Sequence, residues 1–339
     1  MKQEDARELK ANLEYELLSM QQVVAGLEPP ASLALATASF LLNADLTHGS
    51  GHEPAGESLF SELVLAFPAL GISRRAEEYL LAVRVQTELE DVVQPFLDYV
   101  SQRAGGQLDV RNVVGARVHS GAAGSRQRPV AAGVSIGRAD GITGTLGCFV
   151  TRNGGPAEGL SMNHVLANAN RGTLGDDILQ PGTEDGGAAP GDRIGELIHF
   201  HPLVRPPQAN IVDAALCRFD DAISTSPPIP PLTLFEADTG DAVEKCGRTT
   251  GRTEGEVTVT ELDGMVLDVP GFGPAIFDGL FEVESSIEGI FSDVGDSGAL
   301  VTDRSGSRAA GLLLGGLDAV SWVIPLSTTL QALGVALVR

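Results

Sequence analysis

Hydrophobic residues near the start of the chain recur at helical spacing. Steps of three and four residues separate Leu9, Leu13, Leu17, Met20 and Val24. This spacing places them on one face of a helix, which would end before the prolines at 29–30. Further apolar segments predict helices over 31–44, 57–70 and 73–103, with a break near the proline at 95. We therefore expect residues 1–104 to form an α-helical domain of about four or five helices.

The apolar face of this domain has two interpretations. A stripe at helical spacing more often forms a core than a docking surface. Part of it could instead pack on the rest of the chain or hold a regulatory protein partner. Residues 1–104 are therefore expected to act as a regulatory or interaction domain.

The pattern changes after a glycine- and serine-rich stretch at 105–130, which is typical of a linker. Over 131–339, short apolar segments alternate with glycines, acids and prolines, as in β-strands separated by turns. The apolar segment at 326–337 predicts a closing helix. About twelve strands are expected, over 132–138, 144–151, 159–163, 194–200, 210–218, 242–248, 254–260, 264–269, 279–284, 298–303, 308–315 and 320–325.

Composition and charge narrow the possible partners. The chain is 43% hydrophobic and 20% charged, which is typical of a globular protein, and its net charge is −22. Such a charge repels phosphate backbones and anionic lipid, so we expect neither nucleic acid nor membrane as a partner. Because the start of the chain lacks the apolar core of a signal peptide, we expect a cytoplasmic location. The cysteines, expected as small buried residues rather than reactive thiols, are Cys148, Cys217 and Cys246.

The segment Gly295-Asp296-Ser297-Gly298 is the strongest chemical signal in the chain. Glycines on either side allow a tight turn and close approach of another backbone. Such a turn can aim the N–H groups of Gly295 and Ser297 at one point, where an oxyanion would be stabilised. A chain of this length would contain the tetrapeptide by chance about one time in 100, so the segment needs suitable partners elsewhere.

A nucleophilic serine needs a histidine as base and a carboxylate that orients the histidine. His164 ends an apolar, strand-like segment, and Asp213 is a single acid within an apolar strand. A lone buried carboxylate is costly unless a partner meets it, so Asp213 is the best candidate for the acid. The spacing of His48 and His52 could suggest a metal pair, but a solvated loop is the favoured interpretation. The other histidines, expected to be solvated or packed, are His119, His199 and His201.

Four segments around these residues resemble one family. Residues 144–150 (GTLGCFV) resemble an early strand of the chymotrypsin- and trypsin-like serine peptidases, and 162–165 (MNHV) resemble the histidine segment of HtrA-type members. Residues 213–216 (DAAL) resemble the strand of the catalytic acid. Residues 247–257 are similar to a segment of bacterial relatives of the plant narrow-leaf type trypsin-like protease. The resemblance covers residues 131–339 and keeps the family order of histidine, aspartate and serine.

The resemblance implies a fold and an activity. Residues 131–339 would form two β-barrels and a C-terminal helix, so that the whole chain is α+β with its helical domain first. The activity would be that of a serine endopeptidase with the triad His164, Asp213 and Ser297, and with Gly295 and Ser297 in the oxyanion hole. No cofactor or metal is implied. The residues expected to contact a polypeptide or peptide substrate are Phe291, Leu314, Gly315 and Gly316.

The chain also departs from the family. Val165 stands where animal trypsins have a cysteine, so that disulfide is missing. No Ile-Val-Gly-Gly segment is present whose freed amine could pair with Asp296, so that acid needs an arginine or backbone donors instead. Activity regulated by residues 1–104 or by a partner is therefore expected. The alternative is a catalytically silent protease fold that acts as a binding or adaptor module.

Overall fold

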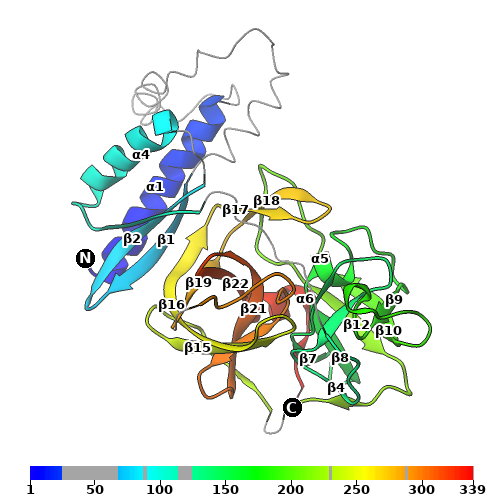
Figure 1. Cartoon of the computed structure of the whole chain (residues 1–339). Coiled ribbons are helices and arrows are strands. Elements are labelled where there is room, and N and C mark those ends of the chain that lie inside the picture. Colours follow the sequence, from blue (N-terminus) through cyan, green and yellow to red (C-terminus); the bar gives the residue numbers. More distant parts are fainter. Residues whose placement is uncertain (25–67, 87–89, 114–123, 229–230, 287–288, 339) are drawn as a thin grey trace.

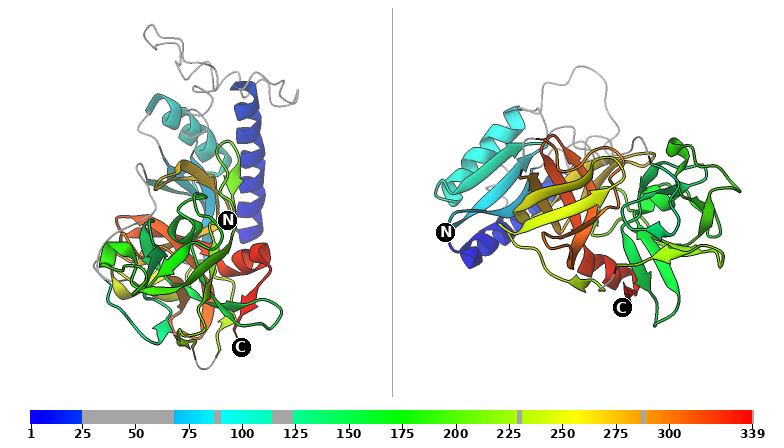
Figure 2. Two further views of the ribbon diagram at one scale, coloured as in Figure 1. Left: turned by 90° about the vertical axis from the view of Figure 1, so that its right-hand side faces the viewer. Right: turned by 60° about the horizontal axis from the view of Figure 1, so that its bottom comes forward.

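The computed structural model describes residues 1–24, 68–86, 90–113, 124–228, 231–286 and 289–338 (Figure 1). The predicted helix over 31–44 and the histidines His48, His52 and His119 lie outside these residues. The described chain has three parts: an N-terminal block, a closed β-barrel and an open β-sheet. Both views in Figure 2 place the barrel beside the N-terminal block, and the right-hand view shows the open sheet beyond it.

The barrel consists of six strands. Its strand order is β15-β20-β21-β22-β19-β16, and an additional pairing of β15 with β16 closes the ring. Fully buried side chains of Val243, Val257, Val283 and Leu313 fill its interior. The strands are β15 (Ala242–Gly247), β16 (Gly251–Asp263), β19 (Leu280–Ser285), β20 (Leu300–Asp303), β21 (Arg308–Leu317) and β22 (Val320–Pro325).

The second sheet stays open. Its eight strands follow the order β23-β7-β8-β12-β10-β9-β5-β6, and no pairing joins its two ends among the described residues. The predicted pair of closed barrels is therefore one barrel and one open sheet. The strands of the open sheet are β5 (Ser135–Arg138), β6 (Thr143–Thr145), β7 (Cys148–Thr151), β8 (Ala157–Ser161), β9 (Asp177–Leu179), β10 (Arg193–Phe200), β12 (Ala215–Phe219) and β23 (Ala336–Leu337).

Short elements connect these sheets. The predicted closing helix over 326–337 is confirmed as α6 (Leu326–Leu333), but Gly334 ends it with a left-handed φ of 65° and β23 follows. Strand β14 (Thr233–Leu234) pairs with β21. The remaining short elements are β4 (Val130–Ala131), α5 (Asn163–Leu166), η1 (Thr183–Asp185), β11 (Ala209–Asn210), β13 (Thr225–Ser226), β17 (Met265–Val269) and β18 (Gly273–Phe277).

The N-terminal block is a mixed α/β unit that shares a sheet with the barrel. Strand β1 pairs antiparallel with β16, so β1, β2 and β3 extend the barrel sheet, which with β14 has ten strands. Helix α1 contacts β1 and β2, and its Leu13 packs with Leu81 and Phe96. The elements of the block are α1 (Gln3–Val24), β1 (Ala69–Arg75), β2 (Glu78–Val85), α4 (Glu90–Arg103) and β3 (Leu108–Asn112).

The prediction of an all-helical domain over 1–104 is wrong for residues 69–85, which form β1 and β2. A predicted helix over 73–103 is a helix only at its end, and the predicted linker contains β3. Residues 81–85 are all buried, so β2 has no alternation of apolar and polar positions. Apart from Arg84 these residues are apolar, and a short buried run of this kind cannot be told from a buried helical segment by periodicity.

A buried arginine joins the block to the barrel. The guanidinium of Arg84 donates from Nε and Nη2 to the two carboxylate oxygens of Glu282, both at 2.8 Å, and from Nη2 to Asp109 Oδ2 at 2.9 Å. Trp322 Nε1 and Thr258 Oγ1 also donate to Glu282. Burial opposes the charge on Arg84, but Glu282 and Asp109 outweigh it and raise its pKa.

Replacing Arg84 with methionine is expected to destabilise the protein by about 3–5 kcal/mol, because the Glu282 carboxylate would stay buried without its cation. Urea unfolding followed by circular dichroism measures the change. The control is Arg75→Met, which removes an exposed arginine of the same sheet extension. An Arg84→Met loss no larger than the control's would contradict the assignment of this pair as an anchor.

Candidate active site

His164 and Asp213 form a fully buried pair. His164 lies in α5, directly after β8, and Asp213 lies between β11 and β12. His164 Nδ1 is 2.6 Å from Asp213 Oδ2, and the His164 backbone N–H donates to Asp213 Oδ1 at 3.1 Å. Both carboxylate oxygens therefore hold the same residue, which fixes the ring orientation. The buried Nε2 has no hydrogen-bond partner among the described residues.

Two asparagines hold the histidine helix in place. Asn163 Nδ2 donates to His201 O at 2.6 Å and to Asn170 Oδ1 at 2.8 Å. Asn170 Nδ2 donates to Leu203 O at 2.8 Å, and its Oδ1 accepts from Leu203 N. The His201 backbone N–H in turn donates to Ala214 O, the residue after the acid. Sequence reasoning missed both asparagines, although Asn163 stands beside the histidine in the quoted segment.

The predicted nucleophile turn has the conformation that its glycines allow. Gly295 has φ 103° and Gly298 has φ 92°, values that other residues rarely adopt. A Cβ on Gly298 would lie 2.4 Å from Thr145 O. Ser297 is fully buried, and its Oγ donates to Leu314 O at 3.1 Å. The turn thus lies between β6 of the open sheet and β21 of the barrel.

Gly144 shows how closely the serine and the histidine helix approach each other. A Cβ on this glycine of β6 would lie 2.8 Å from Ser297 O and 2.5 Å from Val165 Cγ2, next to His164. The structure therefore brings the three predicted residues into one region. It joins His164 and Asp213 by direct hydrogen bonds, whereas the Ser297 hydroxyl donates to the Leu314 carbonyl. The catalytic roles of the three residues stay a prediction.

Asp296 has a lysine as its charged partner. Lys245 Nζ lies 3.0 Å from Asp296 Oδ2, and both side chains are fully buried. Backbone N–H groups of Thr249, Thr250 and Asp293 also donate to the Asp296 carboxylate. Burial lowers the pKa of Lys245, and Asp296 opposes this shift. Backbone donors were expected here, but the expected arginine is replaced by Lys245 of β15.

Hydrogen bonds fix both peptide groups of the predicted oxyanion hole. Thr249 Oγ1 donates to Val294 O at 2.6 Å, and Ala299 N donates to Asp296 O at 2.8 Å. Since the C=O and N–H of a trans peptide point in opposite directions, these bonds set the directions of the Gly295 and Ser297 N–H groups. Thr249 was missed by sequence reasoning, although it lies within the quoted segment 247–257.

The four predicted substrate contacts fall in different environments. Phe291 is fully buried in the barrel core with Val243 and Val257, so its side chain is a core residue. Leu314 also has a buried side chain, and its carbonyl meets the serine. The last two, Gly315 and Gly316, pair with Trp322 and Ser321 of β22.

Two remaining groups of side chains have no site-like environment. Burial raises the pKa of the Cys148 and Cys217 thiols to about 12, so both are inert at neutral pH, whereas Cys246 is exposed and the expectation of burial is wrong for it. Within the described ranges, no three His, Cys, Asp or Glu side chains gather as a metal site would require. The helices described here include none with the length and apolar character needed to span a membrane.

Comparison with known proteins gave matches among solved structures only. No family model and no curated protein matches the chain. Protease A of Thermobifida fusca matches with 18% identity and a TM-score of 0.44, over 62% of this chain and 98% of its own. Chymotrypsin of Cellulomonas bogoriensis matches with 19% identity and a TM-score of 0.42, over 62% and 98%. A glutamic acid specific serine protease matches with 20% identity and a TM-score of 0.44, over 62% and 100%.

Lys245→Met is expected to slow the reaction of Ser297 with a fluorophosphonate probe at least about tenfold, because the turn would lose the cation that holds Asp296. Mass spectrometry of the labelled protein over time gives the rate. Arg252→Met is the matched control, since it removes an exposed ion pair of the same β15–β16 hairpin. Equal rates for a folded Lys245→Met protein and the unmodified protein would show that the lysine does not support the turn.

Proposed function

We propose that this chain is a serine endopeptidase with the triad His164, Asp213 and Ser297. The observation that carries the proposal is the buried His164–Asp213 pair, held by hydrogen bonds of 2.6 and 3.1 Å. Such a pair fixes the imidazole tautomer and leaves Nε2 to take a proton from an alcohol. The nucleophile turn beside the histidine helix supplies that alcohol.

The proposed reaction has two halves. Ser297 Oγ attacks the carbonyl carbon of a peptide bond while its proton passes to His164 Nε2, and Asp213 stabilises the imidazolium. The Gly295 and Ser297 N–H groups hold the oxyanion, at about 3 kcal/mol per donor. His164 then protonates the leaving amine. Water hydrolyses the acyl-enzyme by the same proton transfers in reverse order.

The strand after the serine is the proposed site for the substrate main chain. Strand β20 pairs with β21 only as far as Leu312, whereas β22 pairs with it through Leu317. One edge of residues 314–316 is therefore without a strand partner among the described elements. An extended peptide could add to this edge through main-chain hydrogen bonds. Gly315 and Gly316 suit this role, since they offer no side chain that would block the approach.

The burial of the triad supports regulation. His164, Asp213 and Ser297 have no exposed surface in the structure, so the surrounding chain must move before a polypeptide can reach the serine. The Ser297 hydroxyl must also turn from Leu314 O toward His164 Nε2. The same observations favour the second candidate, a catalytically silent binding module, in which this closed arrangement would be permanent.

Hydrolysis of a peptide library by the purified chain tests the proposal. Asp213→Asn is expected to lower kcat about 10⁴-fold, because the histidine would lose its orienting carboxylate. Ser297→Ala is expected to abolish both hydrolysis and fluorophosphonate labelling, whereas Ser305→Ala, at an exposed serine, is expected to keep both. Protein that is folded but neither labels at Ser297 nor hydrolyses any peptide would favour the silent module.

A further inference from the structure

The β17–β18 hairpin lies between the N-terminal block and the side of the active site that carries the histidine. It leaves the barrel after β16, returns to it at β19, and pairs with the short strand β11. Figure 1 shows the hairpin between β1 of the N-terminal block and α5, the histidine helix. The base of the hairpin contacts the N-terminal block, and its outer strand β18 contacts the segment that leads to Asp213.

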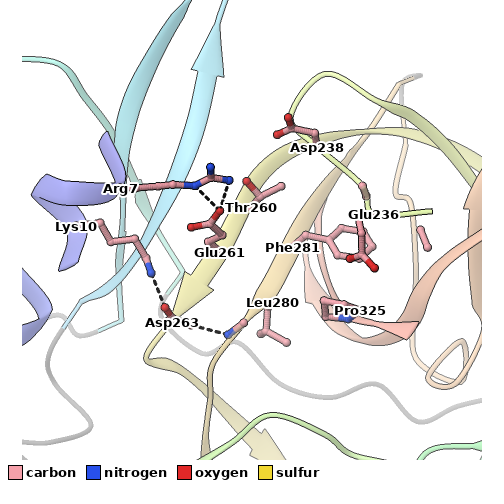
Figure 3. A pocket seen from close by; sticks show the side chains of 13 residues that line it. Arg7, Lys10, Glu236, Asp238, Thr260, Glu261, Asp263, Leu280, Phe281 and Pro325 are labelled. Atoms are coloured by element: carbon pink, nitrogen blue, oxygen red, sulfur yellow. Dashed lines mark hydrogen bonds and ion pairs between the residues drawn. The ribbon is translucent and has the colours of Figure 1, made fainter. Parts of the chain in front are cut away.

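Helix α1 holds one end of the hairpin base. The buried Lys10 Nζ pairs with Asp263 Oδ2 and lies 2.8 Å from Glu14 Oε1. The other carboxylate oxygen of Asp263 accepts the Gly279 N–H at 2.5 Å. Figure 3 shows Lys10 and Asp263 joined in this way. Since Asp263 precedes the hairpin and Gly279 follows it, one carboxylate closes the base and binds the helix.

Gln86, the residue after β2, holds the same hairpin base through a second element of the N-terminal block. Its Nε2 donates to Gly264 O at 2.9 Å, and its Oε1 accepts the Val266 N–H at 2.5 Å. Gly264 N in turn donates to Asp278 Oδ1 at 2.7 Å. Two separate elements of the N-terminal block therefore fix where the hairpin begins.

The outer strand of the hairpin holds the segment of the catalytic acid. Strand β18 pairs with β11, where Asn210 lies opposite Phe277. Asp278 N donates to Asn210 O at 2.9 Å, and Asn210 Nδ2 donates to Ile276 O at 3.1 Å. Asn210 is itself buried, and only two residues separate it from Asp213.

The tip of the hairpin contacts two loops that lie between His164 and Asp213 in the sequence. Arg205, four residues after His201, donates to Phe272 O at 3.0 Å and lies 4.5 Å from the centre of the Phe272 ring. Arg171, which follows the histidine helix and Asn170, donates to Gly271 O. The hairpin therefore contacts the segment that follows α5, the loop that precedes β11, and β11 itself.

We infer that the N-terminal block positions the His164–Asp213 pair through the β17–β18 hairpin, with Lys10 and Gln86 as positioning residues. The inference rests on the proposed function, for which this pair is the general base. Val212 is fully buried, so the short segment from Asn210 to Asp213 has little freedom to absorb a shift of the hairpin. A misplacement of about 1 Å in catalytic geometry can cost up to about 100-fold in rate.

Two variants of the full-length protein test this coupling, and one matched control accompanies them. Lys10→Met keeps the aliphatic stem and removes the charge, and Gln86→Leu removes both hydrogen bonds to the hairpin base. The control is Arg7→Met, which removes the exposed Arg7–Glu261 ion pair one helical turn away on α1 and leaves the hairpin base intact. Three measurements are made on each protein. They are the kinetics on a peptide (kcat and KM), the proton NMR resonance of His164 Nδ1–H, and the midpoint of urea unfolding.

The expected result is a fall in kcat of about tenfold with nearly unchanged KM, together with a displaced His164 resonance, for both test variants. Arg7→Met is expected to match the unmodified protein in all three measurements. Folded Lys10→Met or Gln86→Leu protein with the original resonance and kcat would overturn the inference. So would an equal effect of Arg7→Met. If Lys10→Met does not fold, Gln86→Leu decides the question.

The NMR measurement separates this inference from the proposed function. Unmodified protein that hydrolyses nothing and does not label at Ser297 would refute the proposed function. The His164 resonance would still report whether Lys10 and Gln86 control the pair. If the protein is inactive but the variants displace the resonance, the coupling is supported and the proposed function is refuted. If the protein is active but the variants leave the resonance unchanged, the proposed function is supported and the coupling is refuted.

Discussion

The His164–Asp213 pair depends on a carboxylate that is buried where water cannot solvate it. Such a charge is costly unless hydrogen bonds replace the lost water. Here the histidine supplies two of them, one from its ring and one from its backbone. Because one residue provides both donors, any shift of the acid changes its distance from the base. The rest of the candidate site can be understood as structure that would prevent this shift: the asparagines around the histidine helix, the β11–β18 pairing and the hairpin that continues it.

The sequence was informative where a polar residue stands in a local context that it would not ordinarily occupy. A glycine-flanked serine, a histidine after an apolar strand and a lone acid within another strand indicated the candidate site. The partners that hold those residues were not visible, because they come from distant segments: Lys245 meets Asp296 across 51 positions of sequence, and the Asn210 amide serves the β18 backbone. An amide or a lysine in such a place has no local signature, since its role comes from long-range packing. Phe291 was misplaced for the same reason.

The N-terminal block was misread because burial on both faces removes the alternation by which a strand is recognised. The correction bears on regulation. A separate helical domain could be removed without harm to the peptidase, whereas a block that pairs β1 with β16 and places Arg84 against Glu282 is part of the barrel sheet. Its removal would expose a strand edge and leave Glu282 buried without its cation. Loss of activity in a shortened chain would therefore not show that the block activates the enzyme, and point variants at the contacts give a clearer answer.

The two halves of the candidate triad are held by different means, and this separation makes control by the N-terminal block physically reasonable. The serine turn is held within the barrel by Lys245, with no need for a freed amine. The His164–Asp213 pair belongs to the open sheet and is connected to the N-terminal block through the β17–β18 hairpin. The halves meet along a seam between the open sheet and the barrel. There Thr145 N donates to Ser297 O, and Thr145 Oγ1 donates to Gly295 O. The buried Arg248 also pairs with Asp185 across this seam, at 2.6 Å. None of the seam and Lys245 contacts named above involves a described residue of the N-terminal block, so under the proposed function a change at Lys10 or Gln86 should move His164 relative to Ser297. Under the proposed function, an alteration of that kind would change the rate of proton transfer more than the binding of a peptide on β21.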